Sequence, residues 1–157
     1  IKRKYVRYFI AKFLISWYHI CMKENLIHYR TCVCNINYHM VWSVKYRRKI
    51  LSAEVEAYLQ KLVQEIAEDK GFTVHLFECG EGDHVHCFVS APPKLSITAI
   101  MKYLKGISGR KLFERFPEIR NQLWKGELWN HSYYVEMVGS VSEENIRRYI
   151  EHQSKAY

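Results

Sequence analysis

Two histidines separated by one residue are the side chains whose types and spacing best suit chemistry in this sequence. His84 and His86 lie in an apolar run that ends near Ser90 and is typical of a β-strand. Because successive side chains on a strand point to opposite faces, the two imidazoles share one face. Such a pair supplies half of a metal site. A His-x-His sequence also occurs by chance at sheet surfaces, so the pair alone leaves metal binding and an ordinary polar surface both open.

Polar residues at helical spacing near the end of the chain offer a second half for that site. Asn145, Tyr149 and Gln153 are four residues apart, so they line one face of a predicted helix. A phenol and a carboxamide therefore lie one turn apart. The same pattern also suits a tyrosine that anchors an amphipathic helix to the core, and the helix alone does not decide between the two interpretations.

The first half of the chain predicts a strand, a helix and a β-hairpin. Alternation of apolar and polar residues over Thr31–Lys45 indicates one long, half-buried strand. Ser52 caps a helix with apolar residues at helical spacing, and Gly71 ends it. Two further strands, Phe72–Cys79 and His84–Ser90, are joined by a short turn and form the hairpin.

The second half predicts a helix, a strand and a terminal helix. Ser96 caps the first of these helices, and Tyr133–Val138 alternates like a strand. Ser140 begins a capping box for the last helix, which runs to about Gln153. The order β-α-β-β-α-β-α predicts an α+β fold, the ferredoxin-like split β-α-β sandwich. Its antiparallel sheet has helices on one face, and the added C-terminal helix carries Tyr149.

Composition and charge indicate one domain. The chain has 157 residues, of which 48% are hydrophobic and 25% charged, which is ordinary globular composition. The net charge is +8, and five basic residues without an acid lie within residues 1–21. We interpret residues 1–21 as an upstream or non-native leader, with translation starting at Met22, and residues 22–157 as a single domain. A membrane-surface anchor and an ordinary N-terminal helix stay open for residues 1–21. The basic, partly apolar stretch is too short and too charged to predict a membrane span.

The cysteine and glycine patterns argue against a disulfide framework and against a nucleotide-binding loop. Five cysteines without a Cys-x-x-Cys pair predict a reduced, cytoplasmic protein. The sequence has no Gly-rich phosphate-binding loop, so we expect no nucleotide cofactor.

Several motifs in order resemble one known family. They are His84-Val85-His86, Pro92-Pro93, residues 128–134 and 148–153, and the earlier segments Tyr38–Trp42 and Lys45–Lys49. Over roughly residues 30–154 the chain is similar to single-tyrosine HUH transposases of the insertion-sequence 200/605 family. The resemblance implies that residues 22–157 form an HUH transposase domain.

The resemblance also implies a reaction. The protein would bind hairpins in single-stranded DNA and cleave and rejoin that DNA in transposition. His84, His86 and Gln153 would hold a divalent metal ion, Mg²⁺ or Mn²⁺, and Tyr149 would form a 5′-phosphotyrosine intermediate. The family works as a homodimer, in which the tyrosine helix of one subunit can complete the metal site of the other. Two alternatives stay open: a domesticated HUH nuclease acting on genomic palindromic repeats, and a non-catalytic nucleic-acid-binding ferredoxin-like module.

Other residues have less specific roles. DNA-binding candidates are basic residues in two clusters, and a solvated face explains each of them equally well: Lys45, Arg47, Arg48, Lys49, Lys102, Lys105 and Arg110. Asp83 can orient His84 or bind outer-shell water. His152 competes with Gln153 as a ligand, but it lies on another side of the helix. His39 and His75 are interpreted as structural or close to DNA, and Tyr133-Tyr134 offers a competing nucleophile.

Overall fold

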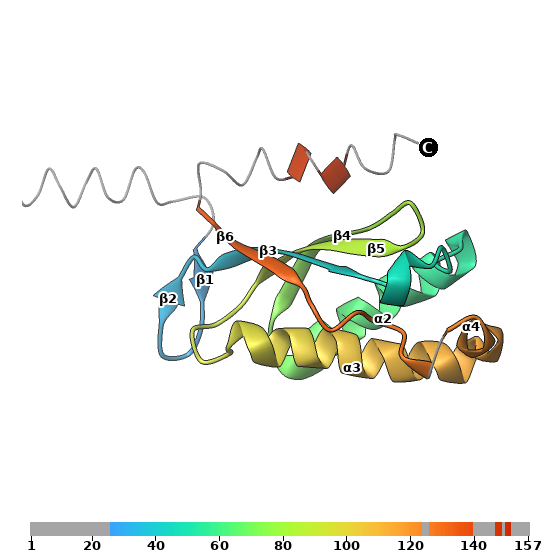
Figure 1. The fold of residues 1–157 in the computed structure, drawn as a ribbon. Helices are drawn as coiled ribbons and strands as arrows, with labels where there is room; N and C mark the ends of the chain where they lie inside the picture. The colour runs from blue at the N-terminus through green and yellow to red at the C-terminus, as the bar shows by residue number, and fades with distance from the viewer. Residues whose placement is uncertain (1–25, 124–125, 140–146, 149, 152–157) are drawn as a thin grey trace, which may run out of the picture. The chain divides into compact units, whose positions relative to one another are not determined.

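A four-stranded antiparallel sheet with two long helices on one face is the main body of the molecule. The computed structural model describes residues 26–123, 126–139, 147–148 and 150–151. The strands are β3 (Asn37–Ser43), β4 (Thr73–Gly80), β5 (His84–Ser90) and β6 (Tyr134–Val138), in the order β4-β5-β3-β6 (Figure 1). Strand β5 lies between β3 and β4, so these two strands form the split β-α-β unit around it. The predicted α+β ferredoxin-like arrangement is confirmed.

The helices begin where the sequence predicts. In α2 (Ala53–Lys70), the Ser52 hydroxyl accepts a hydrogen bond from the Val55 amide, and Gly71 ends the helix with a φ of 75°. In α3 (Ile97–Arg115), the Ser96 hydroxyl accepts one from the Ala99 amide at 3.2 Å. A short helix that the pattern did not predict, α4 (Pro117–Asn121), follows with proline at its start. Proline suits a first helical turn because that turn does not need its amide.

The long strand predicted over Thr31–Lys45 is wrong in its extent. Ile27–His28 (β1) and Val33–Cys34 (β2) pair with each other in a separate small hairpin, and β3 begins at Asn37. Apolar alternation continues through both strands, so it could not reveal that the pairing partner changes. This hairpin belongs to the first of two compact units, residues 1–35, and the sheet and helices belong to the second, residues 36–157.

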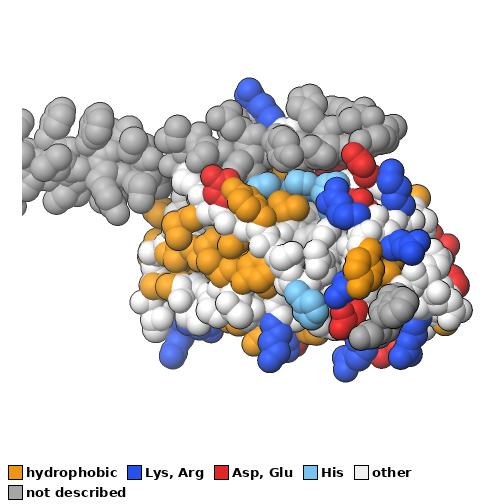
Figure 2. Space-filling view, in the orientation of Figure 1, with side chains coloured by type: hydrophobic (Ala, Val, Ile, Leu, Met, Phe, Trp, Pro, Cys, Tyr) orange, Lys and Arg blue, Asp and Glu red, His pale blue; other side chains and the backbone are white. Residues whose placement is uncertain are grey.

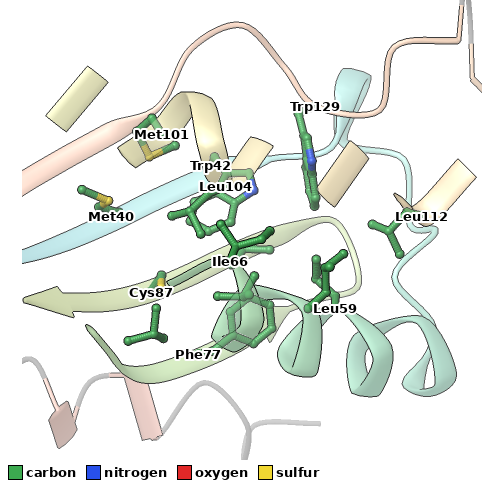
Figure 3. Close-up of a cluster of buried hydrophobic side chains, with 14 of the residues drawn as sticks. Met40, Trp42, Leu59, Ile66, Phe77, Cys87, Met101, Leu104, Leu112 and Trp129 are labelled. Carbon is green, nitrogen blue, oxygen red and sulfur yellow. The ribbon is translucent and has the colours of Figure 1, made fainter. Parts of the chain in front are cut away.

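The core lies between the sheet and the two long helices (Figure 3). Its largest fully buried side chains include Met40 and Trp42 from β3, Leu59 from α2, and Leu104 from α3. The segment before β6 is attached to α3 by the Trp129 indole, which donates a hydrogen bond to the buried Ser108 hydroxyl at 3.0 Å. None of the helices in the described part of the chain is long and apolar enough to cross a membrane.

Candidate active site

The two histidines of the His-x-His motif lie side by side on β5, a strand paired on both sides. Their ring centroids are 5.1 Å apart, and the rings meet edge to face. Val85 and Cys87 alternate with them and are fully buried in the core. The imidazoles therefore lie on the sheet face opposite α2 and α3, as the alternation predicts.

The turn before β5 fixes the His84 ring. Asp83 is buried, and its Oδ1 lies 2.6 Å from His84 Nδ1 while its Oδ2 lies 3.1 Å from Arg47 Nε. Because the carboxylate accepts a hydrogen bond from the Nδ1–H group, Nε2 is the nitrogen whose lone pair is left for a metal ion. Gly80 lies directly beneath the ring, and a Cβ built there would collide with Nε2 and Cε1 of His84. A glycine is therefore required for the ring to lie where it does.

His39 contacts the histidine pair, and the sequence did not predict this contact. Its Nε2 lies 3.1 Å from His86 Nδ1, and the two rings stack with centroids 5.3 Å apart at an angle of 15°. Strand β3 pairs with β5 so that His39 faces Phe88, which places its side chain diagonally against His86. Alternation puts His39 on the correct face, but the register that brings it to His86 follows only from the pairing.

Burial favours the neutral form of the two buried imidazoles, His39 and His86. Burial is the main cause that lowers the pKa of His86, to about 4, and the charges of His84, His39 and Arg47 lower it further. Burial also lowers the pKa of His39, against an opposing effect of Glu136. Neutral imidazole is the form that binds a metal ion.

The donor set fits half of a metal site. The two imidazoles lie side by side, and each has its Nδ1 in a hydrogen-bond contact, with His39 for His86 and with the Asp83 carboxylate for His84. The carboxylate partner defines the tautomer of His84. Within the described ranges, no group of three or more His, Cys, Asp or Glu side chains is arranged to hold a metal ion. The predicted third ligand, Gln153, has an amide side chain and lies outside those ranges, so its role stays a prediction.

The described residues near the end of the chain pack on this same face. Arg147, Arg148, Ile150 and Glu151 have helical backbone. Ile150 is fully buried against Phe88 and Val138, and the Arg147 guanidinium lies 5.2 Å from the centre of the Phe88 ring. Phe88 is the next residue after His86 on this face of β5. The predicted residues Asn145, Tyr149, His152 and Gln153, and the Ser140 capping box, lie outside the described residues.

The first basic cluster adjoins the histidines. It occupies η1 (Lys45–Arg47) and the residues after it, and Lys49 lies 3.9 Å from Glu81 in the turn before β5. Figure 2 shows histidine side chains and basic side chains close together on one face of the molecule. The cluster is therefore well placed for an anion bound near His84 and His86.

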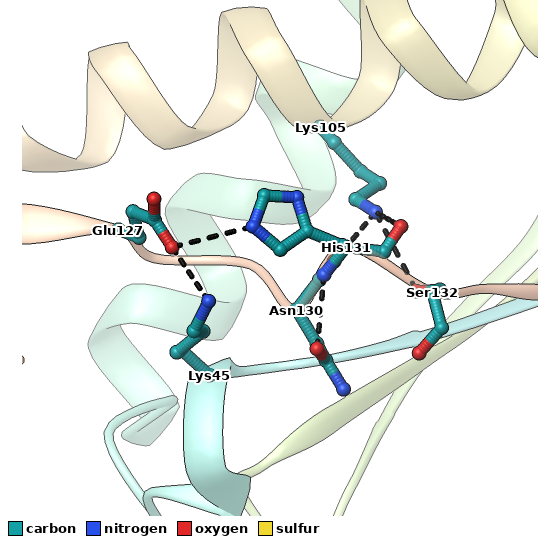
Figure 4. A network of polar contacts seen from close by, with 6 residues as sticks. All are labelled: Lys45, Lys105, Glu127, Asn130, His131 and Ser132. Atoms are coloured by element: carbon teal, nitrogen blue, oxygen red, sulfur yellow. Dashed lines mark hydrogen bonds and ion pairs between the residues drawn. The ribbon is translucent and has the colours of Figure 1, made fainter.

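The second basic cluster lies along α3, on the other side of the sheet. Lys105 points at the segment before β6, where its ammonium donates to the carbonyl oxygens of Asn130 at 2.6 Å and His131 at 3.0 Å (Figure 4). This contact gives Lys105 a structural role that the sequence did not indicate. Arg110 lies 3.8 Å from Glu114, and Lys102 is exposed.

Comparison with known proteins gives one family. Residues 32–153 match the family model described as "Transposase IS200 like". The chain is 39% identical over 124 residues to the ISDra2 transposase TnpA of Deinococcus radiodurans, covering 79% of this chain and 88% of that protein. It is 34% identical over 119 residues to the transposase for insertion sequence element IS200 of Salmonella typhimurium, covering 76% and 77%.

Solved structures have the same fold. A crystal structure of a Deinococcus radiodurans R1 protein superposes with a TM-score of 0.67 at 35% identity, covering 81% of this chain and 97% of that one. A REP-associated tyrosine transposase bound to a REP hairpin superposes with a TM-score of 0.54 at 12% identity, covering 80% and 68%. At that identity the second likeness concerns the fold alone.

Proposed function

The chain belongs to the IS200-like transposase family, and on that premise we propose that it cleaves and rejoins single-stranded DNA through Tyr149. His84, His86 and Gln153 hold a divalent metal ion, Mg²⁺ or Mn²⁺, in this proposal. The substrate is DNA that folds into hairpins, and the reaction moves an insertion sequence.

The observation that carries the assignment of Tyr149 is the packing of its sequence neighbour. Ile150 is fully buried against Phe88, on the strand and the face that carry His84 and His86. Arg147 contacts the same ring. Both sides of Tyr149 in the sequence are therefore attached to the histidine face. The competing nucleophile candidates lie elsewhere in the chain: Tyr134 is the first residue of β6, and Tyr133 is the residue before it.

The chemistry follows from these residue types. The phenolate oxygen of Tyr149 attacks phosphorus, and a bond forms between them while the bond from phosphorus to the 3′ oxygen breaks. The DNA 5′ end stays attached to the tyrosine, and the 3′ oxygen leaves and takes up a proton. The bound metal ion supplies positive charge for the non-bridging oxygens of the phosphate. Neutral imidazole and amide ligands leave that charge undiminished. Rejoining reverses the step with another 3′ hydroxyl, so no nucleotide cofactor is needed.

DNA binding and assembly complete the proposal. The exposed cations beside the histidines are suited to phosphate contacts, among them Arg47, which lies 3.1 Å from the Asp83 carboxylate that holds His84. Binding to hairpins is what the resemblance to the insertion-sequence 200/605 family implies, and a protein of the same fold, the REP-associated tyrosine transposase, has been solved bound to a REP hairpin. The protein acts as a homodimer in the cytoplasm, and the tyrosine helix of one subunit can serve the histidines of the other.

The test is a covalent adduct. Labelled single-stranded DNA from the flanks of the gene is incubated with the protein in Mn²⁺ or in EDTA and run on a denaturing protein gel. We expect a labelled protein band only in Mn²⁺, and none with Tyr149→Phe. Tyr134→Phe is the matched control, because that phenol lies on the histidine face with its ring centroid 6.4 Å from that of His39. An adduct that survives Tyr149→Phe and disappears with Tyr134→Phe would contradict the assignment. Tight binding without any adduct would favour the non-catalytic module.

A further inference from the structure

The turn between β3 and α2 holds two adjacent residues in a backbone conformation that their side chains disfavour. Tyr46 has φ 58° and ψ 24°, and Arg47 has φ 53°. Left-handed backbone is natural for glycine and costs free energy for a tyrosine or an arginine. Such strain persists only where the surrounding structure enforces it, and it is concentrated at functional sites.

Backbone hydrogen bonds enforce this turn. The Val44 amide donates to the Asp83 carbonyl at 2.7 Å, and the Lys45 amide donates to the Leu128 carbonyl at 2.8 Å. The Arg47 amide closes the turn on the Val44 carbonyl at 3.0 Å. Two segments distant in the sequence therefore fix the turn, and one of them is the turn that carries Asp83.

Both side chains of this turn are exposed, and one of them reaches the histidine site. Tyr46 is 66% exposed, so its ring contributes little to the core. The Lys45 ammonium lies 5.6 Å from the ring centre and is held at 2.6 Å by Glu127. The side chain of Arg47 is 58% exposed, with Nε on the Asp83 carboxylate that also binds His84. An exposed ring, with a guanidinium next to it at the edge of the histidine site, matches the base and the phosphate of one nucleotide.

We propose that Tyr46 and Arg47 form a nucleotide-binding clamp next to the histidines. The Tyr46 ring stacks on an unpaired base of the single strand, and Arg47 binds the adjoining phosphate and so positions the strand over His84 and His86. This inference deepens the proposed function and rests on it for the identity of the strand.

The experiment distinguishes the effect of the Tyr46 ring from the effect of the strained backbone. Tyr46→Asn removes the ring but suits left-handed backbone, since asparagine adopts it more readily than tyrosine. Tyr46→Phe keeps the ring. Tyr133→Asn is the matched control for a lysine-paired ring, because the Lys105 ammonium lies 5.7 Å from its centre. The full-length proteins are titrated in EDTA with single-stranded DNA from the gene flanks that carries 2-aminopurine at successive positions.

We expect Tyr46→Asn to weaken binding about 5- to 150-fold, the range for loss of one stacked base. Its melting temperature should be equal to or above that of the wild type. Tyr46→Phe and Tyr133→Asn should bind like the wild type. Stacking should quench 2-aminopurine at one position in the wild type and not in Tyr46→Asn. An abasic site at that position should weaken binding by the wild type and leave binding by Tyr46→Asn unchanged.

Unchanged affinity and quenching in Tyr46→Asn would overturn the clamp, as would an equal loss in Tyr133→Asn. The adduct assay distinguishes that failure from failure of the proposed function. If the wild type forms the Tyr149 adduct while Tyr46→Asn binds normally, the transposase mechanism stands and the clamp does not. If no adduct forms but the ring still determines binding and quenching, the clamp stands and the mechanism fails. Absence of any binding by the wild type overturns both.

Discussion

Replacing Gly80 by alanine tests whether the position of the His84 ring matters for metal binding. Gly80 lies in β4 opposite His84, and its φ is not among the positive values, so alanine suits its backbone. The only obstacle is the new Cβ, which would collide with Nε2 and Cε1 of His84. These atoms are at the end of a side chain that can rotate, so the ring is expected to turn aside while the strand stays in place.

The expected losses of stability and of Mn²⁺ affinity follow from the contacts that the His84 ring gives up. Turning aside breaks the 2.6 Å hydrogen bond between His84 Nδ1 and Asp83, which costs about 1.5–3 kcal/mol for a bond to a charged group. For a chain of this size the melting temperature should fall by roughly 2–4 °C per kcal/mol. Affinity for Mn²⁺ should fall by at least about 10- to 100-fold, the usual effect of disturbing the groups that orient a ligand.

Isothermal titration with Mn²⁺ and thermal unfolding of the same samples measure both effects. Gly106→Ala is the matched control, since a Cβ at that position in α3 meets nothing within 4 Å. Alanine should stabilise that helix by about 1 kcal/mol and leave Mn²⁺ affinity unchanged. Wild-type Mn²⁺ affinity in Gly80→Ala would refute the claim that the ring must lie over Gly80 to bind metal.

Three further outcomes are expected. Asp83→Asn removes the charge that orients His84, so Mn²⁺ affinity by titration should fall about 10-fold or more; unchanged affinity would limit Asp83 to a structural role. Lys105→Met should lower the melting temperature by several degrees, because the ammonium binds backbone carbonyls before β6, whereas exposed Lys102→Met should leave it unchanged; equal melting temperatures would contradict the structural role of Lys105. Burial raises the pKa of the Cys87 thiol, so at pH 8 a thiol reagent followed by peptide mass mapping should label Cys87 only after denaturation; rapid labelling of the native protein would show that the core opens at β5.

Local patterns in the sequence predict much of this fold. Ser52 and Ser96 are followed by helices because a hydroxyl cap needs only the next few residues. The face shared by His84 and His86 follows from the two-residue period of a strand. Asp83 is adjacent to His84, so its role was among the alternatives that the sequence left open.

Features that depend on pairing between distant segments were not predicted. The contact of His39 with His86 needs the register of β3 against β5, and the contact of Arg47 with Asp83 needs two turns to meet. The small β1–β2 hairpin was missed because apolar alternation is the same whichever strand is the partner. The predicted roles of Tyr149 and Gln153 stay predictions, because both residues lie outside the described residues.

The central position of β5 has a consequence for how long anything bound at the histidines stays there. Its backbone is hydrogen-bonded to β3 on one side and to β4 on the other, and its inward side chains are fully buried. Amides in such a strand exchange with solvent only when the whole domain opens. Arg147 and Ile150, by contrast, join this face through side-chain contacts with Phe88. The residence time of a ligand on His84 and His86 is therefore set by its own dissociation and not by local opening of the strand that carries them.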